Sequence, residues 1–439
     1  MKLWPEGGLW RQSDFLKLWS AETVSQFGTQ ISQLALPLAA IDVLHASAFE
    51  VAALTTVQFL PFLLVSLPAG VWVDRLPRRP ILIAGDLARA GLLASIPIAY
   101  FFDALTIWQL YGVGFLVGIA TVFFDVAYQS YLPSLVERRQ IIDGNAKLEI
   151  SRTGAQLGGP GVAGLLIGWL KAPAAILIDA VSFLGSALFI FTMRKSELSQ
   201  GDRAPRRKMR TELREGLSYV LRHPYLKNIA ACTALFNFFG SLGFAVLLVF
   251  ARRELHLSPQ AIGLAFTLGN VGPLLAAFSA NRISARLGVG RTIIVSSILG
   301  GPMFLLIPFA PHGHAALAIL VPATLVGGFT NVVYNIAQVS LRQAITPERI
   351  QGRMNSVMRF IVWGTIPLGA ITGGGLASWI GLKETLILGG AGCCLAFLPV
   401  LFSPVRSLRE MPEPLEDEPL DVILADAHAE AAAVLPPHV

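Results

Sequence analysis

The chain has 439 residues, of which 54% are hydrophobic and 14% charged, and its formal net charge is +6. Soluble domains carry roughly 25% charged residues, so this composition excludes an ordinary soluble protein. The basic residues lie in short loops between apolar runs, which favours a membrane partner and argues against nucleic acid.

Apolar runs long enough to cross a bilayer follow one another along the chain. Thr292–Leu341 carries no Asp, Glu, Lys or Arg, and it is long enough for two spans with a hinge at Pro308–His314. About 20 apolar residues cross the hydrocarbon core as a helix. We therefore predict an all-α membrane protein with 12 transmembrane helices: 16–43, 51–73, 80–102, 105–131, 146–170, 174–193, 226–250, 259–281, 291–310, 315–341, 354–380 and 384–403.

The first predicted helix carries a polar stripe. Its members recur about every four residues and are Glu22, Gln26, Gln30 and Gln33. A charge inside a bilayer costs roughly 2.5–3.5 kcal/mol on insertion scales, so such groups are functional candidates. We interpret the stripe as part of a transport pathway, with Glu22 as the first candidate for proton coupling. Hydrogen bonding between helices is the alternative.

Further ionisable residues fall inside the next spans. Asp86 and Arg89 are spaced i,i+3 and predict a local pair. Asp125 and Arg152 lie at similar depth on adjacent helices, so either an ion pair between them or a pair of Asp125 with Arg78 is plausible, and Asp125 is also a coupling candidate. A further acid, Asp179, lies midway along its helix without an evident partner.

The long central loop and the second half offer fewer candidates. Leu213, Leu217, Val220 and Leu221 recur at helical spacing beside arginines, which predicts a short helix on the membrane surface that ends at Pro224. Asn331 and Asn335, with Gln338, share one face of the tenth span and are either pathway residues or helix–helix contacts. The three cysteines lie in apolar spans without other metal ligands, so we predict no metal site.

A stretch of the first half recurs 210 positions later. Arg139, Asn145, Gly154, Gly159, Gly164, Leu166 and Trp169 match Arg349, Asn355, Gly364, Gly369, Gly374, Leu376 and Trp379. Two repeated six-helix halves indicate the parallel-repeat plan of one transporter class, with two pseudo-symmetric bundles around a central substrate site. The same offset places Glu149 opposite Arg359, and we predict that this pair gates the cytoplasmic side. Pairing of each within its own half is the alternative.

The side of the membrane follows from the basic residues. Most of the 34 Lys and Arg residues lie in the termini, the central loop and alternate loops, whereas the other loops hold Lys171, Arg252, Arg253 and Lys383. This bias places both termini in the cytoplasm. The predicted organisation is a segment 1–14, a bundle 15–193, a cytoplasmic loop 194–224, a bundle 225–403 and an acidic tail 404–439.

The loop between the second and third spans resembles a motif of the major facilitator superfamily. Gly70-Val71-Trp72-Val73-Asp74-Arg75-Leu76-Pro77-Arg78-Arg79 matches that family's GxxxDRxxRR pattern in spacing, charge order and position. The motif residues Gly70, Asp74, Arg75, Arg78 and Arg79 are expected to form a conformational latch. The segments Phe123–Pro133 and Asn145–Pro160 resemble the bacterial branch of enterobactin-type siderophore exporters and macrolide efflux pumps.

The resemblance implies the major facilitator fold and a secondary transporter in the bacterial cytoplasmic membrane. It would export a bulky small molecule, drug-, macrolide- or siderophore-like, by proton-coupled antiport; an uptake carrier or lipid-type flippase is the alternative. Many drug/proton antiporters have an Asp seven residues before the Ala-Leu-Pro of helix 1, where this chain has Gly28. Without a nucleotide motif or a catalytic set, we expect no enzyme activity, no cofactor, and a monomer driven by the proton gradient.

Overall fold

The computed structural model describes residues 9–73, 76–136, 140–193, 209–409 and 425. In these residues the chain is helical, with short connections and without a strand. It divides into two compact units, Met1–Asp202 with Leu248–Thr267, and Arg203–Leu247 with Leu268–Val439. The segment Leu248–Thr267, which the sequence assigns to the second half, therefore belongs to the first unit.

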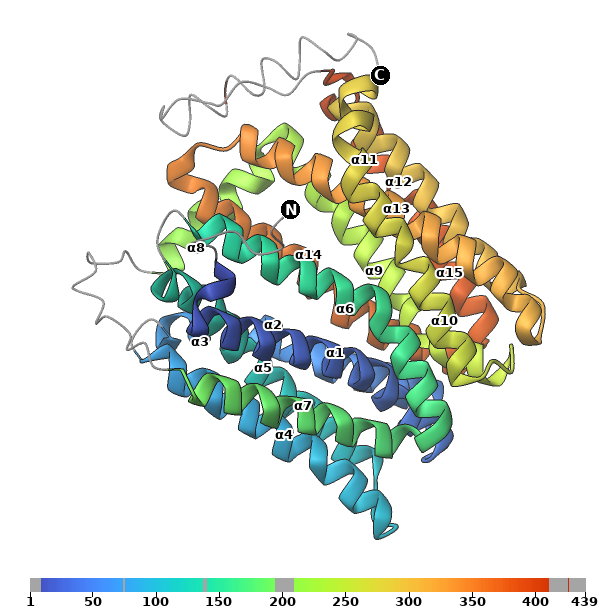
Figure 1. The fold of residues 1–439 in the computed structure, drawn as a ribbon. Helices are drawn as coiled ribbons and strands as arrows, with labels where there is room; N and C mark the ends of the chain where they lie inside the picture. Colours follow the sequence, from blue (N-terminus) through green and yellow to red (C-terminus); the bar gives the residue numbers. More distant parts are fainter. Residues whose placement is uncertain (1–8, 74–75, 137–139, 194–208, 410–424, 426–439) are drawn as a thin grey trace, which may run out of the picture. The chain divides into compact units, whose positions relative to one another are not determined.

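The first unit contains the helices α1 to α7, together with the end of α9 and most of α10 (Figure 1). A 3-10 turn at Leu9–Arg11 precedes them. The helices are α1 (Ser13–Asp42), α2 (Ala48–Leu64), α3 (Ser66–Val73), α4 (Arg78–Phe101), α5 (Ile107–Leu135), α6 (Ile141–Leu170) and α7 (Ala172–Phe191).

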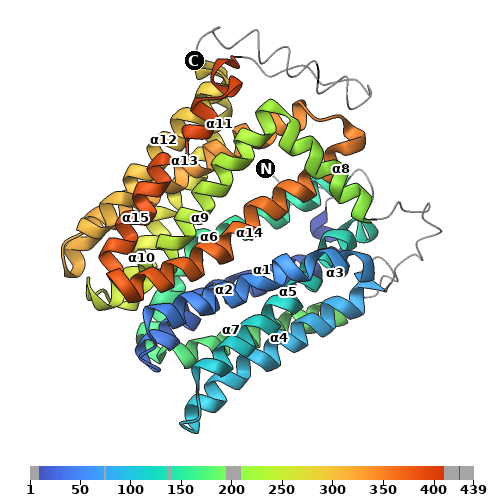
Figure 2. The same ribbon diagram turned by 180° about the vertical axis from the view of Figure 1, so that it is seen from behind.

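The second unit begins with the predicted interfacial helix and contains the remaining spans (Figure 2). Its helices are α8 (Met209–Arg222), α9 (Pro224–Arg253), α10 (Pro259–Gly269), α11 (Val271–Leu287), α12 (Val289–Leu306), α13 (Leu317–Ala344), α14 (Glu348–Ile380), α15 (Leu382–Leu395) and α16 (Leu398–Leu401). The end of α9 from Leu248 and most of α10, up to Thr267, belong to the first unit. Short 3-10 turns at Ile307–Phe309 and Gly313–Ala316 separate α12 from α13, at the hinge that the sequence predicts.

Nine helical segments of the described residues are long and apolar enough to cross a membrane. They are Arg78–Phe101, Ile107–Tyr128, Ala172–Phe191, Pro224–Arg253, Pro259–Leu287, Val289–Phe309, Gly313–Ala344, Arg353–Ile380 and Leu382–Leu401. The other three predicted spans are also helical, but α1 and α6 are more polar and the span 51–73 is divided into α2 and α3. The prediction of an all-α membrane protein is confirmed.

Three predicted spans are broken where the sequence predicts continuous helices. Val65 separates α2 from α3, Asn270 separates α10 from α11, and Ala396 and Phe397 separate α15 from α16. At the second break, a Cβ on Gly272 would overlap the Leu325 carbonyl oxygen of α13. The chain therefore bends where its backbone approaches a neighbouring helix closely, which small residues allow in membrane proteins.

Within the first unit, α7 packs against both α1 and α4, while α1 also packs against α6 and α2 against α5. Glycine permits two of these contacts. A Cβ on Gly28 of α1 would overlap the side chains of Asp179 and Ser182 on α7, and a Cβ on Gly159 of α6 would crowd Gln30. These positions hold α1, α6 and α7 at close separation.

Within the second unit, α12 packs against α13 and α15, α11 against α13, and α8 against α14. The predicted helix in the central loop is present as α8, which ends before Pro224, and its position on the membrane surface stays a prediction. Its Tyr219 hydroxyl donates to the Ile345 carbonyl at 2.8 Å, and its Glu215 pairs with Arg353 at 2.5 Å. The central-loop helix is thereby attached to the start of α14.

Candidate functional site

The polar stripe of α1 contains one buried acid held by a neutral partner. Glu22 is 8% exposed, and the Gln26 amide donates to its Oε1 at 2.6 Å. Gln30 lies against Gly159 of α6, whereas Gln33 is exposed. In the described residues no Lys or Arg lies within 4 Å of Glu22. The only hydrogen bond to this carboxyl that the structure records comes from an amide.

A buried ion pair lies on α4. Arg89 Nη2 and Asp86 Oδ1 are 2.5 Å apart, and both side chains are almost fully buried. The Arg89 guanidinium also lies over the rings of Phe124 at 4.1 Å and Phe183 at 4.2 Å. The predicted local pair is confirmed, and two aromatic rings cover the cation.

Asp125 and Arg152 do not form an ion pair in this structure. Both side chains are exposed, and among the described residues no salt bridge within 4 Å joins them. Arg89 and Arg152 are nevertheless the cations that act electrostatically on Asp125. The pairing of Asp125 with Arg152 or Arg78, and its role in coupling, stay predictions.

The loop motif is described only in part, because Asp74 and Arg75 lie outside the described residues. Gly70 belongs to α3, and Arg78 begins α4 and is buried. Arg79 donates to the carbonyls of Ile190 at 3.3 Å and Phe191 at 2.6 Å, the last two residues of α7. A cation at a helix C-terminus is favourable, so Arg79 fastens the start of α4 to the end of α7. The latch role of Asp74 stays a prediction.

The candidates of α13 share a face, as the sequence predicts. Asn331 and Asn335 are exposed one turn apart, and buried Gln338 donates to the Asn335 side chain at 2.8 Å. Glu149 on α6 and Arg359 on α14 are both exposed and belong to different units. Pathway lining by the asparagines and the gate formed by Glu149 and Arg359 stay predictions.

The sequence did not predict an ion pair that joins the turns after α1 and α9. Arg252 Nη2 at the end of α9 lies 2.9 Å from Asp42 Oδ1 at the end of α1, and Arg253 donates to the Ala46 carbonyl at 2.6 Å. These residues all belong to the first unit. In the same unit, neither Gly164 of α6 nor Gly263 of α10 leaves room for a Cβ.

A short repeat could have revealed these turns. Leu44-His45-Ala46-Ser47 and Leu255-His256-Leu257-Ser258 lie 211 positions apart. Both histidines have positive φ, at 52° and 54°, and both serines accept a backbone N–H at the start of the next helix. Equivalent turns thus close the first helix of each sequence half.

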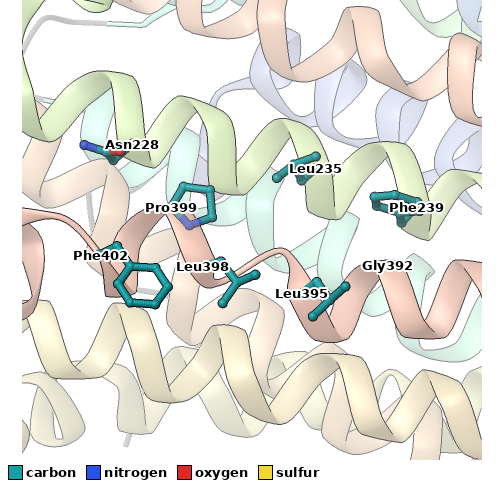
Figure 3. A pocket seen from close by; sticks show the side chains of 8 residues that line it. All are labelled: Asn228, Leu235, Phe239, Gly392, Leu395, Leu398, Pro399 and Phe402. Carbon is teal, nitrogen blue, oxygen red and sulfur yellow. The ribbon is translucent and has the colours of Figure 1, made fainter.

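An apolar groove of about 400 Å³ lies between α9 and the α15–α16 segment of the second unit. Figure 3 shows its lining: Asn228, Leu235, Phe239, Gly392, Leu395, Leu398, Pro399 and Phe402. The single polar side chain, Asn228, donates to the Pro224 carbonyl of its own helix. None of the predicted pathway residues lines this groove.

Comparison with known proteins places the whole chain among transporters. The sequence profile of the family described as "Transmembrane secretion effector", MFS_3, matches residues 8–428. The uncharacterised MFS-type transporter YfiS of Bacillus subtilis is 25% identical over 89% of this chain and 92% of its own length. The multidrug efflux pump Tap of Mycolicibacterium fortuitum is 26% identical over 84% of this chain and 90% of its own length. The macrolide efflux protein A of Streptococcus pyogenes is 24% identical over 90% of this chain and 97% of its own length.

Solved structures share the fold. A bacterial homologue of the iron transporter ferroportin in its inward-facing state superimposes with a TM-score of 0.71, covering 88% of this chain and 98% of that chain at 18% identity. The nucleoside transporter NupG (D323A mutant) superimposes with a TM-score of 0.72, covering 88% of this chain and 99% of that chain at 12% identity. At such identities the likeness establishes the fold and leaves the substrate open.

Proposed function

The chain belongs to the transmembrane secretion effector family of major facilitator transporters, and from this premise we propose that it exports bulky, partly apolar small molecules by proton-coupled alternating access. Two relatives of similar length are a multidrug efflux pump and a macrolide efflux protein, which supports an efflux substrate. The proposed location is the cytoplasmic membrane, with both termini on the cytoplasmic side because of the basic loops.

The observation that carries the proposal is the Glu22 carboxyl. It is buried on α1 and receives a hydrogen bond from the Gln26 amide, without a cation within 4 Å among the described residues. An unpaired ionised carboxylate in a membrane interior is costly, so a proton or a cationic substrate has to neutralise it. An exchange of the two at this carboxyl would couple proton entry to substrate export.

In the proposed cycle, Glu22 binds a proton in the outward-open state, and this favours release of the substrate. Return to the inward-open state delivers the proton to the cytoplasm, where the next substrate binds. Gln30 and Gln33 extend the polar stripe from Glu22 along α1. Asp125 is the second candidate for proton binding.

The test uses the purified protein in liposomes, with erythromycin and ethidium as probes of the macrolide and lipophilic-cation classes. We expect an imposed proton gradient to accelerate movement of at least one probe by about tenfold. In Glu22→Gln the movement should no longer respond to the gradient, while Gln33→Ala, which changes the exposed end of the same stripe, should keep the response. Unchanged gradient dependence in Glu22→Gln would assign coupling to Asp125 or to another group.

Direction and substrate class need a second measurement. Cells that express the protein should accumulate less ethidium and erythromycin than cells that carry Glu22→Gln. Increased accumulation would instead support an uptake carrier. Movement of a fluorescent phospholipid between leaflets, with neither drug transported, would support the flippase alternative.

A further inference from the structure

A second buried acid lies in the first unit, at the contact between α7 and α1. Asp179 is 1% exposed, and the Ser182 hydroxyl donates to its Oδ1 at 3.1 Å. The buried Ser32 hydroxyl of α1 faces the same carboxyl. A Cβ on Gly28 would overlap both Asp179 Oδ1 and Ser182 Oγ. The carboxyl therefore occupies space that only a glycine at position 28 leaves free.

Two charged residues of α4, Arg89 and Asp86, act electrostatically on Asp179. The same two residues act on Glu22 of α1, as does Asp125 of α5. Helix α6 also packs against α7. Its charged residues all precede Thr153, so they lie far along α6 from the turn at Lys171, where α7 begins. Asp179 and Glu22 are thus two carboxyls beside one ion pair.

Charge compensation among these groups is incomplete. The Arg89 guanidinium pairs with Asp86, and the rings of Phe124 and Phe183 cover it. No Lys or Arg lies within 4 Å of Glu22 or Asp179 in the described part of the chain. Three buried carboxyls therefore share one buried cation, which leaves two negative charges to be neutralised in an apolar interior.

We propose that Asp179 is a second proton-binding carboxyl of this transporter, so that Glu22 and Asp179 both carry protons beside a fixed Arg89–Asp86 pair. The enclosed position, with the Ser182 hydroxyl donating to the carboxyl and Gly28 packed against it, suits a proton and excludes a larger ligand. The inference rests on the proposed coupling at Glu22 and adds a second site to it. With both protons bound, the four groups are electrically neutral.

The first test observes the proton directly and does not depend on transport. Infrared difference spectra of the purified full-length protein in lipid, recorded between acidic and alkaline pH, report the C=O stretch of each protonated carboxyl. In Asp179→Asn, which retains an oxygen to accept the Ser182 hydrogen bond, we expect one band to disappear. In Ser182→Ala, which keeps the carboxyl but removes its donor, the band should remain and titrate at a different pH.

A relocation experiment makes the test specific to this position. Gly28→Asp alone should impair folding, because its side chain would overlap Asp179 and Ser182. Gly28→Asp combined with Asp179→Gly moves the carboxyl from α7 to α1 across the same contact. We expect this double variant to fold and to recover the infrared band, whereas Asp179→Gly alone should lack it.

Proton counting then connects the site to transport. In liposomes that contain a pH-sensitive dye, Asp179→Asn should move about half as many protons per exported probe as the unchanged protein. An infrared difference spectrum unaltered by Asp179→Asn would overturn the proposal, since Asp179 would not exchange its proton. An unaltered proton count would overturn its role in coupling. If the unchanged protein shows no gradient-driven transport but loses the band in Asp179→Asn, the proposed function fails while the proton site stands.

Discussion

Arg89 is a buried cation that acts on three buried carboxyls, those of Asp86, Glu22 and Asp179, and its own contacts hold it in place. Asp86 binds its Nη2, its Nε donates to the Gly85 carbonyl at 3.4 Å, and aromatic rings from α5 and α7 cover it. Removing one member of a buried pair commonly costs about 3–5 kcal/mol, because the other charge is left unpaired. Arg89 therefore determines how much negative charge this part of the first unit tolerates.

We expect Arg89→Met to lower the thermal unfolding temperature of the purified protein, because Asp86 loses its cation. The double variant Arg89→Met with Asp86→Asn should recover much of that loss, since the unpaired charge is gone. Unfolding followed by intrinsic fluorescence in detergent measures both effects. An unfolding temperature for Arg89→Met that equals that of the unchanged protein would contradict the structural role of the pair.

For single residues, the sequence predicted contacts within a helix better than contacts between helices. The pair of Asp86 and Arg89 follows from i,i+3 spacing alone. The neighbours of Asp179 do not, because Gly28 and Ser32 lie on another helix and come close only after α1 packs against α7. The hydrogen bonds of Arg79 to the end of α7 were missed for the same reason.

Among the elements, α8 connects the central loop to α14 through a few specific contacts. A Cβ on Gly216 would lie 2.9 Å from the Arg353 carbonyl oxygen, so the two helices touch backbone to backbone. Tyr219 is buried and donates to the Ile345 carbonyl just before α14. Leu217 and Leu221 are exposed on the other side of α8. The buried face of this amphipathic helix therefore packs against protein.

The attachment of α8 should depend on alkaline pH. Burial raises the pKa of Tyr219 to about 12, whereas a tyrosine in an unfolded chain has a pKa of about 10. The neutral phenol therefore stabilises the docked helix fully below about pH 10, and this contribution is lost as the pH rises toward 12. A spin label at Leu217→Cys should become more mobile between pH 8 and 11.5, as measured by electron paramagnetic resonance.

Tyr219→Phe provides the control for this experiment. It removes a hydrogen bond worth about 1 kcal/mol, so the label should be somewhat more mobile at pH 8. Without a titrating phenol, however, the mobility should change little between the two pH values. An equal pH response in both proteins would assign the effect to a different group.

The sequence predicted where helices lie, but it did not predict where a helix is interrupted. Apolar runs and prolines predicted the spans and the hinge between α12 and α13. The breaks at Val65, at Asn270 and at Ala396 and Phe397 were missed, because the apolar pattern continues through all three. At Asn270 the nearby approach of Gly272 to Leu325 arises from packing against α13, which no local pattern encodes.

For the whole molecule, the two repeated turns offer a test of how the first unit is held together. Arg252 binds Asp42, and Arg253 binds the Ala46 carbonyl, so two consecutive cations of α9 fasten to the turn after α1. The basic-residue bias predicts that both turns lie on the outer side of the membrane. A contact there would favour conformations in which these turns are together, so alternating access would have to break it.

We expect Asp42→Arg and Arg252→Asp each to slow transport of the active probe by several-fold in liposomes. The combined variant, which restores opposite charges in reversed order, should recover part of the rate. High salt should reduce the effect of the single variants, because the pair is partly exposed. Single variants with unchanged rates would show that this pair is not part of the transport cycle.

The repeat itself was visible in the sequence, but the boundary of the compact units was not. The matched glycines and arginines predict two similar halves. The placement of Leu248–Thr267 in the first unit depends on contacts such as Arg252 with Asp42 and Gly263 with Gly164, which join segments far apart in the chain. Such contacts are set by tertiary packing, and a single sequence does not report them.

The ion pair at the two turns also distinguishes a chain with two repeated halves from a dimer of two identical halves. At an offset of either 210 or 211 residues, the position equivalent to Asp42 holds an arginine, Arg252 or Arg253. Two identical halves would carry the same residue at both positions, so they would bring like charges together where this chain has an ion pair. The attraction exists only because the halves have diverged within one polypeptide, and a homodimer of either half alone would lack it.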